Sequence, residues 1–285
     1  MNLRYWSNNK HVRPLLRTDI DQVRNLALKD PISNCFILSR LNDLSNNSWS
    51  LQNDISVFEN NKVIESVVYN GANIIPLETN EESRVAFAQY LLDSPRRASS
   101  IVGDKTQVLD LWSLLKPFWN KPREIRSNQP VLVINDAPLL SPDPLVRPAV
   151  LRDLEILLPA CVSMFTEEVG VSPVVGSSEQ IYRARISEVI QQRKMFARID
   201  QSQVTFKAEI GVATDQVCQI QGVWVPPQLR GRDYGKAGMA AVVDLTRKYF
   251  SPMVSLYVND YNERARAVYK SVGFQEHSTF ATVLF

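Results

Sequence analysis

The sequence has little cysteine and little histidine. Its 285 residues include three cysteines and two histidines. No two cysteines form a Cys-x-x-Cys pair, so the pattern does not favour a zinc site, and three scattered thiols do not favour a disulfide framework. We therefore expect no metal site, and we expect Cys35, Cys161 and Cys218 to be reduced residues of the core.

The sequence also lacks an excess of charge and a long apolar run. Thirty-two Lys and Arg residues balance 30 Asp and Glu residues, which gives a formal net charge of +2. This balance does not favour binding to nucleic acid, which requires a strong positive field. No apolar run approaches the roughly 20 residues of a membrane helix, and residues 1–10 are polar, unlike a signal peptide. We expect a soluble, cytoplasmic protein without a nucleic-acid or membrane partner, and the oligomeric state stays open.

Proline is concentrated between residues 135 and 148. Closely spaced prolines remove backbone donors and favour extended conformations in the residues before them. The chain is also long enough for two domains of average size. We predict a linker at 138–145 between an N-terminal domain, 1–137, and a C-terminal domain, 146–285.

The two predicted domains open with similar residues. Val12-Arg13-Pro14 is followed by Asp19, and Val146-Arg147-Pro148 is followed by Asp153 at the same spacing. Each aspartate precedes a helical pattern and lies where the N-cap of a helix is expected. The similarity indicates either a tandem duplication or a chance repeat of a short motif.

Strand and helix patterns alternate along both halves. In the first half we expect strands at 54–58, 62–69 and 99–102, with a turn at Asn60-Asn61, and helices at 81–92 and 107–119. In the second half we expect helices at 181–192, 235–250 and 263–272, and strands at 195–199, 204–212, 217–225, 254–258 and 274–285. This order predicts an α/β fold made of a mixed sheet covered by helices.

Residues 223–237 carry the first motif with a chemical meaning. A strand ends in prolines, continues into a loop with glycine and arginine, and leads into a long helix. Such a loop presents free backbone N–H groups at the positive end of a helix dipole, which suits a phosphate or pyrophosphate. Arg230, Arg232 and Lys236 add positive charge. The alternative is an ordinary strand-to-helix turn.

Residues 262–274 carry the second motif. On a helix, Asn262, Ala265 and Tyr269 are separated by three and four positions and therefore share one face. Gly273 is placed to end this helix in a left-handed conformation. Taken alone, Tyr269 is equally well interpreted as an amphipathic core residue.

Together, the two motifs resemble the GNAT acetyltransferase superfamily. That family shows V-x-V-x-P-x-x-R-G-x-G-x-G across a strand, loop and helix, and later N-x-x-A-x-x-x-Y-x-x-x-G-F. The second pattern is complete from Asn262 to Phe274, whereas the first departs at Asp233, where the family usually has glycine. A looser register, Arg232-x-x-Gly235-x-Ala237, also fits. The resemblance implies two GNAT-like domains in tandem, each a mostly antiparallel twisted sheet flanked by helices.

The resemblance also implies a site for acetyl-coenzyme A, the acyl donor of this family. Val223 and Val225 would offer backbone groups to the pantetheine arm and the acyl carbonyl. Asn262 would bind the arm, and Ala265 would leave room for it. The pyrophosphate would be held by the amides of Arg230, Gly231, Arg232, Asp233, Tyr234, Gly235 and Lys236.

For catalysis, the resemblance implies direct transfer, with Tyr269 donating a proton to the departing thiolate. Glu209, on a predicted strand, is the first candidate for the general base; the alternative is an outward-facing strand residue. Glu167 and Glu168 are placed to line the acceptor site. If Asp233 takes up the left-handed conformation, aspartate tolerates it better than most residues, at some cost compared with glycine. We expect its carboxylate to point away from the pyrophosphate or to be neutralised by Arg230 or Arg232.

Neither motif occurs in the first half. In the first half, the segment that corresponds to the phosphate loop of the second half lies between Leu77 and Ser83. It carries Glu78, Glu81 and Glu82, which would repel a pyrophosphate. We therefore expect a degenerate N-terminal GNAT-like domain and an active C-terminal one.

The predicted function is an N-acetyltransferase that moves an acetyl or short acyl group from acetyl-coenzyme A to a primary amine of a small molecule or peptide. The alternatives are a sensor that binds acetyl-coenzyme A without turnover, and an interaction protein.

Overall fold

The computed structural model describes residues 11–45, 54–93, 95–174 and 178–285. They form two compact units. The first unit extends to Val131 and also includes Tyr257–Tyr261 and Glu276–Phe285, and the second comprises Leu132–Leu256 and Asn262–Gln275. The last strand of the chain therefore belongs to the first unit. The predicted linker at 138–145 divides the chain by its sequence repeat, whereas the compact units divide it by contacts, with a boundary between Val131 and Leu132. The linker therefore stays a prediction.

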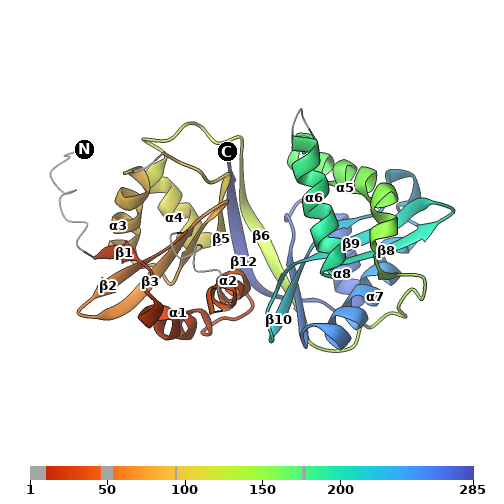
Figure 1. The fold of residues 1–285 in the computed structure, drawn as a ribbon, viewed down its shortest axis with the longest axis horizontal. Coiled ribbons are helices and arrows are strands. Elements are labelled where there is room, and N and C mark those ends of the chain that lie inside the picture. Colours follow the sequence, from red (N-terminus) through yellow and green to blue (C-terminus); the bar gives the residue numbers. More distant parts are fainter. Residues whose placement is uncertain (1–10, 46–53, 94, 175–177) are drawn as a thin grey trace. The chain divides into compact units, whose positions relative to one another are not determined.

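The first unit is a layered sheet with a helix pair on each face (Figure 1). Its elements are β1 (Val12–Pro14), η2 (Arg17–Asp19), α1 (Ile20–Ala27), α2 (Cys35–Ser45), β2 (Ile55–Asn60), β3 (Val63–Asn70), β4 (Ile74–Leu77), α3 (Glu81–Leu92), β5 (Ser100–Asp104), α4 (Lys105–Leu115), most of β6 (Glu124–Ile134), and β12 (Gln275–Leu284). The strand order is β1-β2-β3-β4-β5-β12-β6. Among the strand pairs of this unit whose register is described, β4 and β5 run parallel and the others run antiparallel. Neighbouring residues of β3 serve opposite cores, since Val67 packs with α1 and α2 and Val68 packs with α3 and α4.

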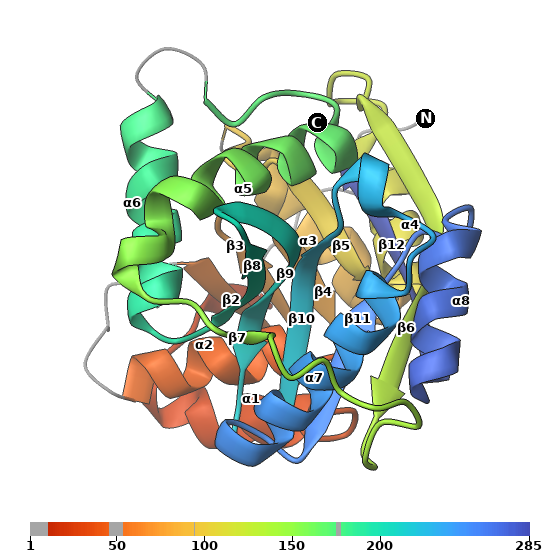
Figure 2. The ribbon, with the colours of Figure 1, turned by 90° about the vertical axis from the view of Figure 1, so that its right-hand side faces the viewer.

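The second unit repeats this plan (Figure 2). Its elements are β7 (Arg147–Pro148), η4 (Leu151–Asp153), α5 (Leu154–Val169), α6 (Ser178–Gln191), β8 (Met195–Asp200), β9 (Gln203–Ala213), β10 (Val217–Trp224), η5 (Pro227–Leu229), α7 (Tyr234–Tyr249), β11 (Met253–Tyr257) and α8 (Glu263–Val272). The strand order is β7-β8-β9-β10-β11, antiparallel except for the parallel pair β10–β11. Helices α5 and α6 form a core with β8 and β9. In the part of the chain that the structure describes, no helix has both the length and the apolar character needed to cross a membrane.

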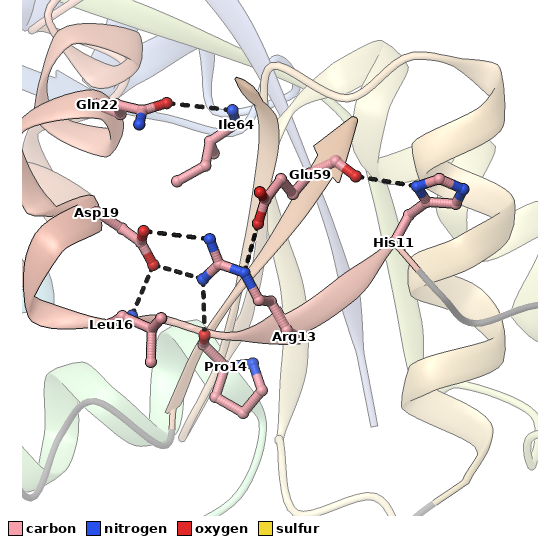
Figure 3. Close-up of polar contacts among 8 residues, drawn as sticks. All are labelled: His11, Arg13, Pro14, Leu16, Asp19, Gln22, Glu59 and Ile64. Atoms are coloured by element: carbon pink, nitrogen blue, oxygen red, sulfur yellow. Dashed lines mark hydrogen bonds and ion pairs between the residues drawn. The ribbon is translucent and has the colours of Figure 1, made fainter. Parts of the chain in front are cut away.

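The short sequence repeat corresponds to a repeated polar structure. Arg13 Nη1 lies 2.5 Å from Asp19 Oδ2, and Arg147 Nη1 lies 2.6 Å from Asp153 Oδ2. Each carboxylate also accepts the backbone N–H of the residue three positions before it. Figure 3 shows the first of these clusters, in which Arg13 also reaches Glu59 of β2. The two aspartates do precede α1 and α5, but their carboxylates bond backward along the chain and do not cap the first helical turn.

The second cluster makes a testable contribution to stability. The hydrogen bond from Arg147 lowers the pKa of Asp153, although partial burial opposes it. Because the folded-state pKa is depressed, this stabilisation is present above the ordinary aspartate pKa near 3.9 and is lost as pH falls through the folded value. Asp153→Asn should lower the free energy of unfolding by about 1 kcal/mol at pH 7, measured by urea denaturation. The exposed Asp215→Asn is the matched control, and a deficit that does not shrink on acidification would contradict the assignment.

Several predicted elements agree closely with the structure. Helices α3 and α8 have the predicted bounds, and the three cysteines are free and buried. The predicted hairpin forms, but its turn is Asn61-Lys62, both with positive φ, and lies one residue later than Asn60-Asn61. Helix α2 and strand β6 were not predicted.

Candidate functional site

Strand β10 leaves its neighbour β11 partway along its length. The two strands pair from Val217 to Gln219, and β10 then continues to Trp224 without β11 as a described partner. Its pairing with β9 is also irregular between Gln221 and Trp224, where Gly222 has a φ of +60°. A bulge of this kind removes backbone groups from the hydrogen bonding of the sheet. Gly222 and Val223 therefore have no described partner in the pairing of β10 with either neighbour.

The backbone of Val225 is partly engaged by the protein itself. Arg230 Nε donates to the Val225 carbonyl oxygen at 3.0 Å. The same arginine lies 2.7 Å from Glu167 Oε2, an atom that also accepts from Trp224 Nε1 at 3.2 Å. The hydrogen bond from Arg230 lowers the pKa of Glu167 and outweighs its partial burial. Glu167 thus anchors the loop arginine to α5.

The loop before α7 leaves a set of backbone donors without partners. In the described residues, no acceptor bonds to the amides of residues 231–236, and the first N–H bonded to the helix start is that of Ala237, which donates to the Asp233 carbonyl oxygen. Gly231 and Asp233 both have positive φ, +80° and +60°. Unpaired amides at the start of a 16-residue helix form a site suited to an anion.

Asp233 is left-handed, with a φ of +60°, and precedes α7 as its N-cap residue. Its carboxylate lies 2.9 Å from Lys236 Nζ and is 74% exposed. Of the two expected arrangements, one had the carboxylate pointing away from the pyrophosphate and the other had it neutralised by Arg230 or Arg232; the ion pair in the structure is with Lys236. The reason is local geometry, because residues three apart at the start of a helix lie on one face, whereas Arg230 is held by Glu167.

Asp233→Gly should leave the affinity for acetyl-coenzyme A unchanged or increase it severalfold. The substitution removes a negative charge beside the free amides, releases Lys236, and relieves a left-handed residue of roughly 1 kcal/mol of strain. Titration calorimetry measures the affinity, and Asp233→Asn separates the effect of charge from that of the backbone. A large loss of affinity in both variants would mean that Asp233 itself contacts the ligand.

The second motif forms a capped helix, α8, that carries a buried phenol. Asn262 is the N-cap of α8, and its Oδ1 accepts the N–H of Ala265 at 3.2 Å. Gly273 ends the helix with a φ of +115°, as predicted. Tyr269 is 7% exposed; burial raises the pKa of its phenol well above the ordinary value, and the negative charge of Glu168 raises it further. The phenol of Tyr269 therefore stays protonated, and a protonated phenol has a hydrogen-bond donor to offer.

Glu209 is buried, so the alternative of an outward-facing strand residue is wrong. Its side chain is 3% exposed, and Oε1 accepts from Arg185 Nη2 at 2.8 Å and from Gln221 Nε2 at 2.7 Å. Burial alone would raise the pKa of Glu209, but the charges of Lys207 and Arg185, with these hydrogen bonds, lower it. Glu209 is therefore ionised and firmly held.

The sequence analysis did not predict the polar residues that surround Glu209. Lys207 lies on the same strand, Arg185 comes from α6, and Gln221 comes from β10. A usable signal was present on β9, where Lys207 and Glu209 alternate with apolar residues in a strand that is buried from Val204 to Ile210. Two charges in such a strand indicate a polar cluster inside the fold.

The equivalent helix start in the first unit has part of its backbone donors occupied by its own side chains. Strand β4 ends at Leu77 and α3 begins at Glu81, so the connection is short. Asn80 Oδ1 accepts the N–H of Ser83, Ser83 Oγ accepts the N–H of Asn80, and the N–H of Thr79 donates to a glutamine of α4. These side chains occupy three backbone donors at the start of α3, and Glu81 and Glu82 add negative charge there.

Two segments of the sequence match known families. Residues 196–274 match the acetyltransferase (GNAT) family, and residues 54–157 match a domain of unknown function, DUF4081. No curated protein matches the sequence significantly.

Solved structures share the arrangement of the elements. An acetyltransferase of the GNAT family from Colwellia psychrerythraea is 13% identical with a TM-score of 0.56, over 96% of this chain and 99% of that one. A GCN5-related N-acetyltransferase from Sphaerobacter thermophilus is 13% identical with a TM-score of 0.61, over 95% and 93%. A tandem GNAT protein from the clavulanic acid biosynthesis pathway, solved without AcCoA, is 10% identical with a TM-score of 0.53, over 96% and 98%. At these identities the similarity is one of fold.

Proposed function

The C-terminal part of this chain carries a GNAT acetyltransferase domain within a tandem GNAT fold, and from this premise we propose that the protein transfers an acetyl or other short acyl group from acetyl-coenzyme A to a primary amine. The acceptor is a small molecule or a peptide. The observation that carries the proposal is the separation of β10 from β11 next to the unpaired amides of residues 231–236. One feature suits an extended arm and the other suits a pyrophosphate.

In the proposed complex, the backbone at Val223 and the N–H of Val225 bind the pantetheine arm and the acyl carbonyl. The pyrophosphate lies against the loop and the first turn of α7, the residues being Arg230, Gly231, Arg232, Asp233, Tyr234, Gly235 and Lys236. Asn262 binds the arm with its amide nitrogen, because its oxygen already caps α8. Ala265, half-buried on the first turn of that helix, leaves room for the arm.

The proposed reaction is a direct transfer. The amine nitrogen of the acceptor attacks the thioester carbon, the carbon–sulfur bond breaks, and Tyr269 gives a proton to the departing thiolate. Glu209 accepts the proton of the amine, directly or through water. Its lowered pKa keeps it ionised but makes it a weak base. Glu168, whose charge acts on Tyr269, is the second candidate.

Titration of the purified protein with acetyl-coenzyme A tests the first step, and the release of free thiol with a panel of primary amines tests the second. Binding together with amine-dependent thiol release supports the proposal. Absence of binding in the wild-type protein would overturn it. We place the reaction in the cytoplasm, because three buried cysteines that form no disulfide suit a reducing compartment.

A sensor that holds acetyl-coenzyme A without turnover is the second candidate. It is favoured by the state of Glu209, whose first oxygen is occupied by Arg185 and Gln221 and whose second oxygen is buried. Binding of the cofactor without thiol release for any amine in the panel would favour the sensor.

A further inference from the structure

A buried ammonium group lies beside the proposed acyl site. Lys207 of β9 is 0% exposed, and its Nζ has no hydrogen-bond partner among the described residues. The second carboxylate oxygen of Glu209, two residues later on the same face of the strand, also has none. A buried ammonium that gives up its hydration without a hydrogen bond opposes folding, and the charge of Glu209 offsets only part of this cost. Its presence therefore calls for a functional explanation.

The position of Lys207 is set by a glycine. A Cβ on Gly222 would lie 3.2 Å from Lys207 Nζ and 3.1 Å from the terminal methyl of Met164. The absence of a side chain lets the ammonium lie against the backbone of the β10 bulge. The next residue is Val223, whose backbone we assign to the acyl carbonyl. The positive charge thus lies beside the point where the carbonyl oxygen would be held.

The charges around Lys207 leave an excess of positive charge. Glu209 is the only anion of the cluster in the described residues, and it is already bonded to Arg185. That carboxylate raises the pKa of Arg185 although burial opposes it. Two uncharged groups complete the surroundings: the Cys161 thiol, whose pKa is raised by burial although Lys207 lowers it, and Tyr182, whose hydroxyl donates to the Cys161 carbonyl oxygen. Two cations therefore face one carboxylate.

We propose that Lys207 stabilises the negative charge that develops on the acyl oxygen at the β10 bulge during transfer. The inference rests on the proposed function. As the amine forms its bond to the thioester carbon, the carbonyl electrons move to the oxygen. They return as the carbon–sulfur bond breaks, and the thiolate takes its proton from Tyr269. Lys207 acts on the oxygen through the low-dielectric interior and does not touch the substrate.

Steady-state kinetics of Lys207→Met and Lys207→Gln test the inference, with Lys207→Arg as the variant that keeps the charge. Loss of the charge should lower kcat by roughly 10- to 100-fold and leave the affinity for acetyl-coenzyme A nearly unchanged. Lys207→Arg should retain most of the activity. Lys248→Met, on the exposed end of α7, controls for the loss of one positive charge, and thermal unfolding checks the fold of each variant.

The pH profile separates this role from an indirect one through Glu209. Loss of Lys207 raises the pKa of Glu209, so a defect caused by protonation of Glu209 would recover as pH rises. A defect that is constant from about pH 6 to pH 9 supports the direct role. Full activity of Lys207→Met, or recovery at high pH, overturns the inference and leaves the proposed function intact. Wild-type protein without turnover overturns both.

Discussion

Tyr269→Phe is expected to lower kcat by about 100-fold or more, with the affinity for acetyl-coenzyme A changed by less than about twofold. The substitution removes one hydroxyl and keeps the aromatic ring, which packs edge-on against Phe274 at a centroid distance of 5.8 Å. The fold and the cofactor site should therefore be preserved, and the missing group is the donor to the leaving sulfur. Calorimetry gives the affinity, and thiol release gives the rate.

The physical reason is the protonation state of the phenol. Burial and the charge of Glu168 raise its pKa far above neutrality, so it carries its proton throughout the physiological range. Such a phenol stabilises the thiolate first by a hydrogen bond and then by proton transfer. No loss of activity attributable to deprotonation of Tyr269 should therefore occur below about pH 10, its unperturbed pKa.

The matched control is Tyr249→Phe, the same change on an exposed tyrosine of α7. It should leave kcat and affinity at the wild-type values. Equal activity of Tyr269→Phe and the wild type would remove the proton-donor role. A parallel fall in affinity and rate would instead assign Tyr269 to binding.

Arg230→Glu combined with Gly235→Asp should weaken the binding of acetyl-coenzyme A by about 100-fold or more. Arg230 bridges the Val225 carbonyl oxygen and Glu167, so a glutamate at this position meets Glu167 with like charge and releases the loop. A side chain at Gly235 has space, because the nearest atoms to an added Cβ are 3.8 and 3.9 Å away. The new carboxylates therefore act by charge and loop position, and steric disruption of α7 is not expected.

Lys248→Glu is the control for this pair, since it reverses a charge at the opposite end of the same helix. Its affinity should match that of the wild type, and thermal unfolding should be similar for all three proteins. Wild-type affinity in the double variant would mean that the pyrophosphate does not lie at this loop. The cofactor site would then have to be sought elsewhere in the chain.

Local signals explain why parts of the fold were predictable from the sequence. Helix α8 was predicted with its observed bounds, because Asn262 caps it and Gly273 ends it within a single segment. The positive φ of Asp233 fits its place in a motif that favours glycine, because aspartate tolerates this conformation better than most residues. The repeated Arg-Asp pairs were visible as a short repeat, since the two partners of each pair are only six residues apart in the sequence.

Strand β6 shows where local signals fail. Its first half, residues 124–130, is mostly polar and ends in a proline, so it does not resemble a strand, whereas the apolar run at 131–134 is a strand signal that was missed. The pairing of the polar half depends on partners far along the chain. Gln129 bonds to Asn259 and to Thr282, at 2.8 and 2.6 Å. Contacts at such separations give no periodicity to the segment itself, so the inclusion of the last strand in the first unit was not predictable.

The sequence by itself determined the α/β class, the two motifs of the second unit, and the absence of those motifs from the first. Each depends on residues that are close in the chain and have intrinsic conformational preferences. Only the tertiary structure brought Gly222 of β10 and Arg185 of α6 to Lys207 and Glu209, and gave Glu167 its place beside Arg230. These groups come from different strands and helices, and their charges acquire their effect only when folding removes the water between them.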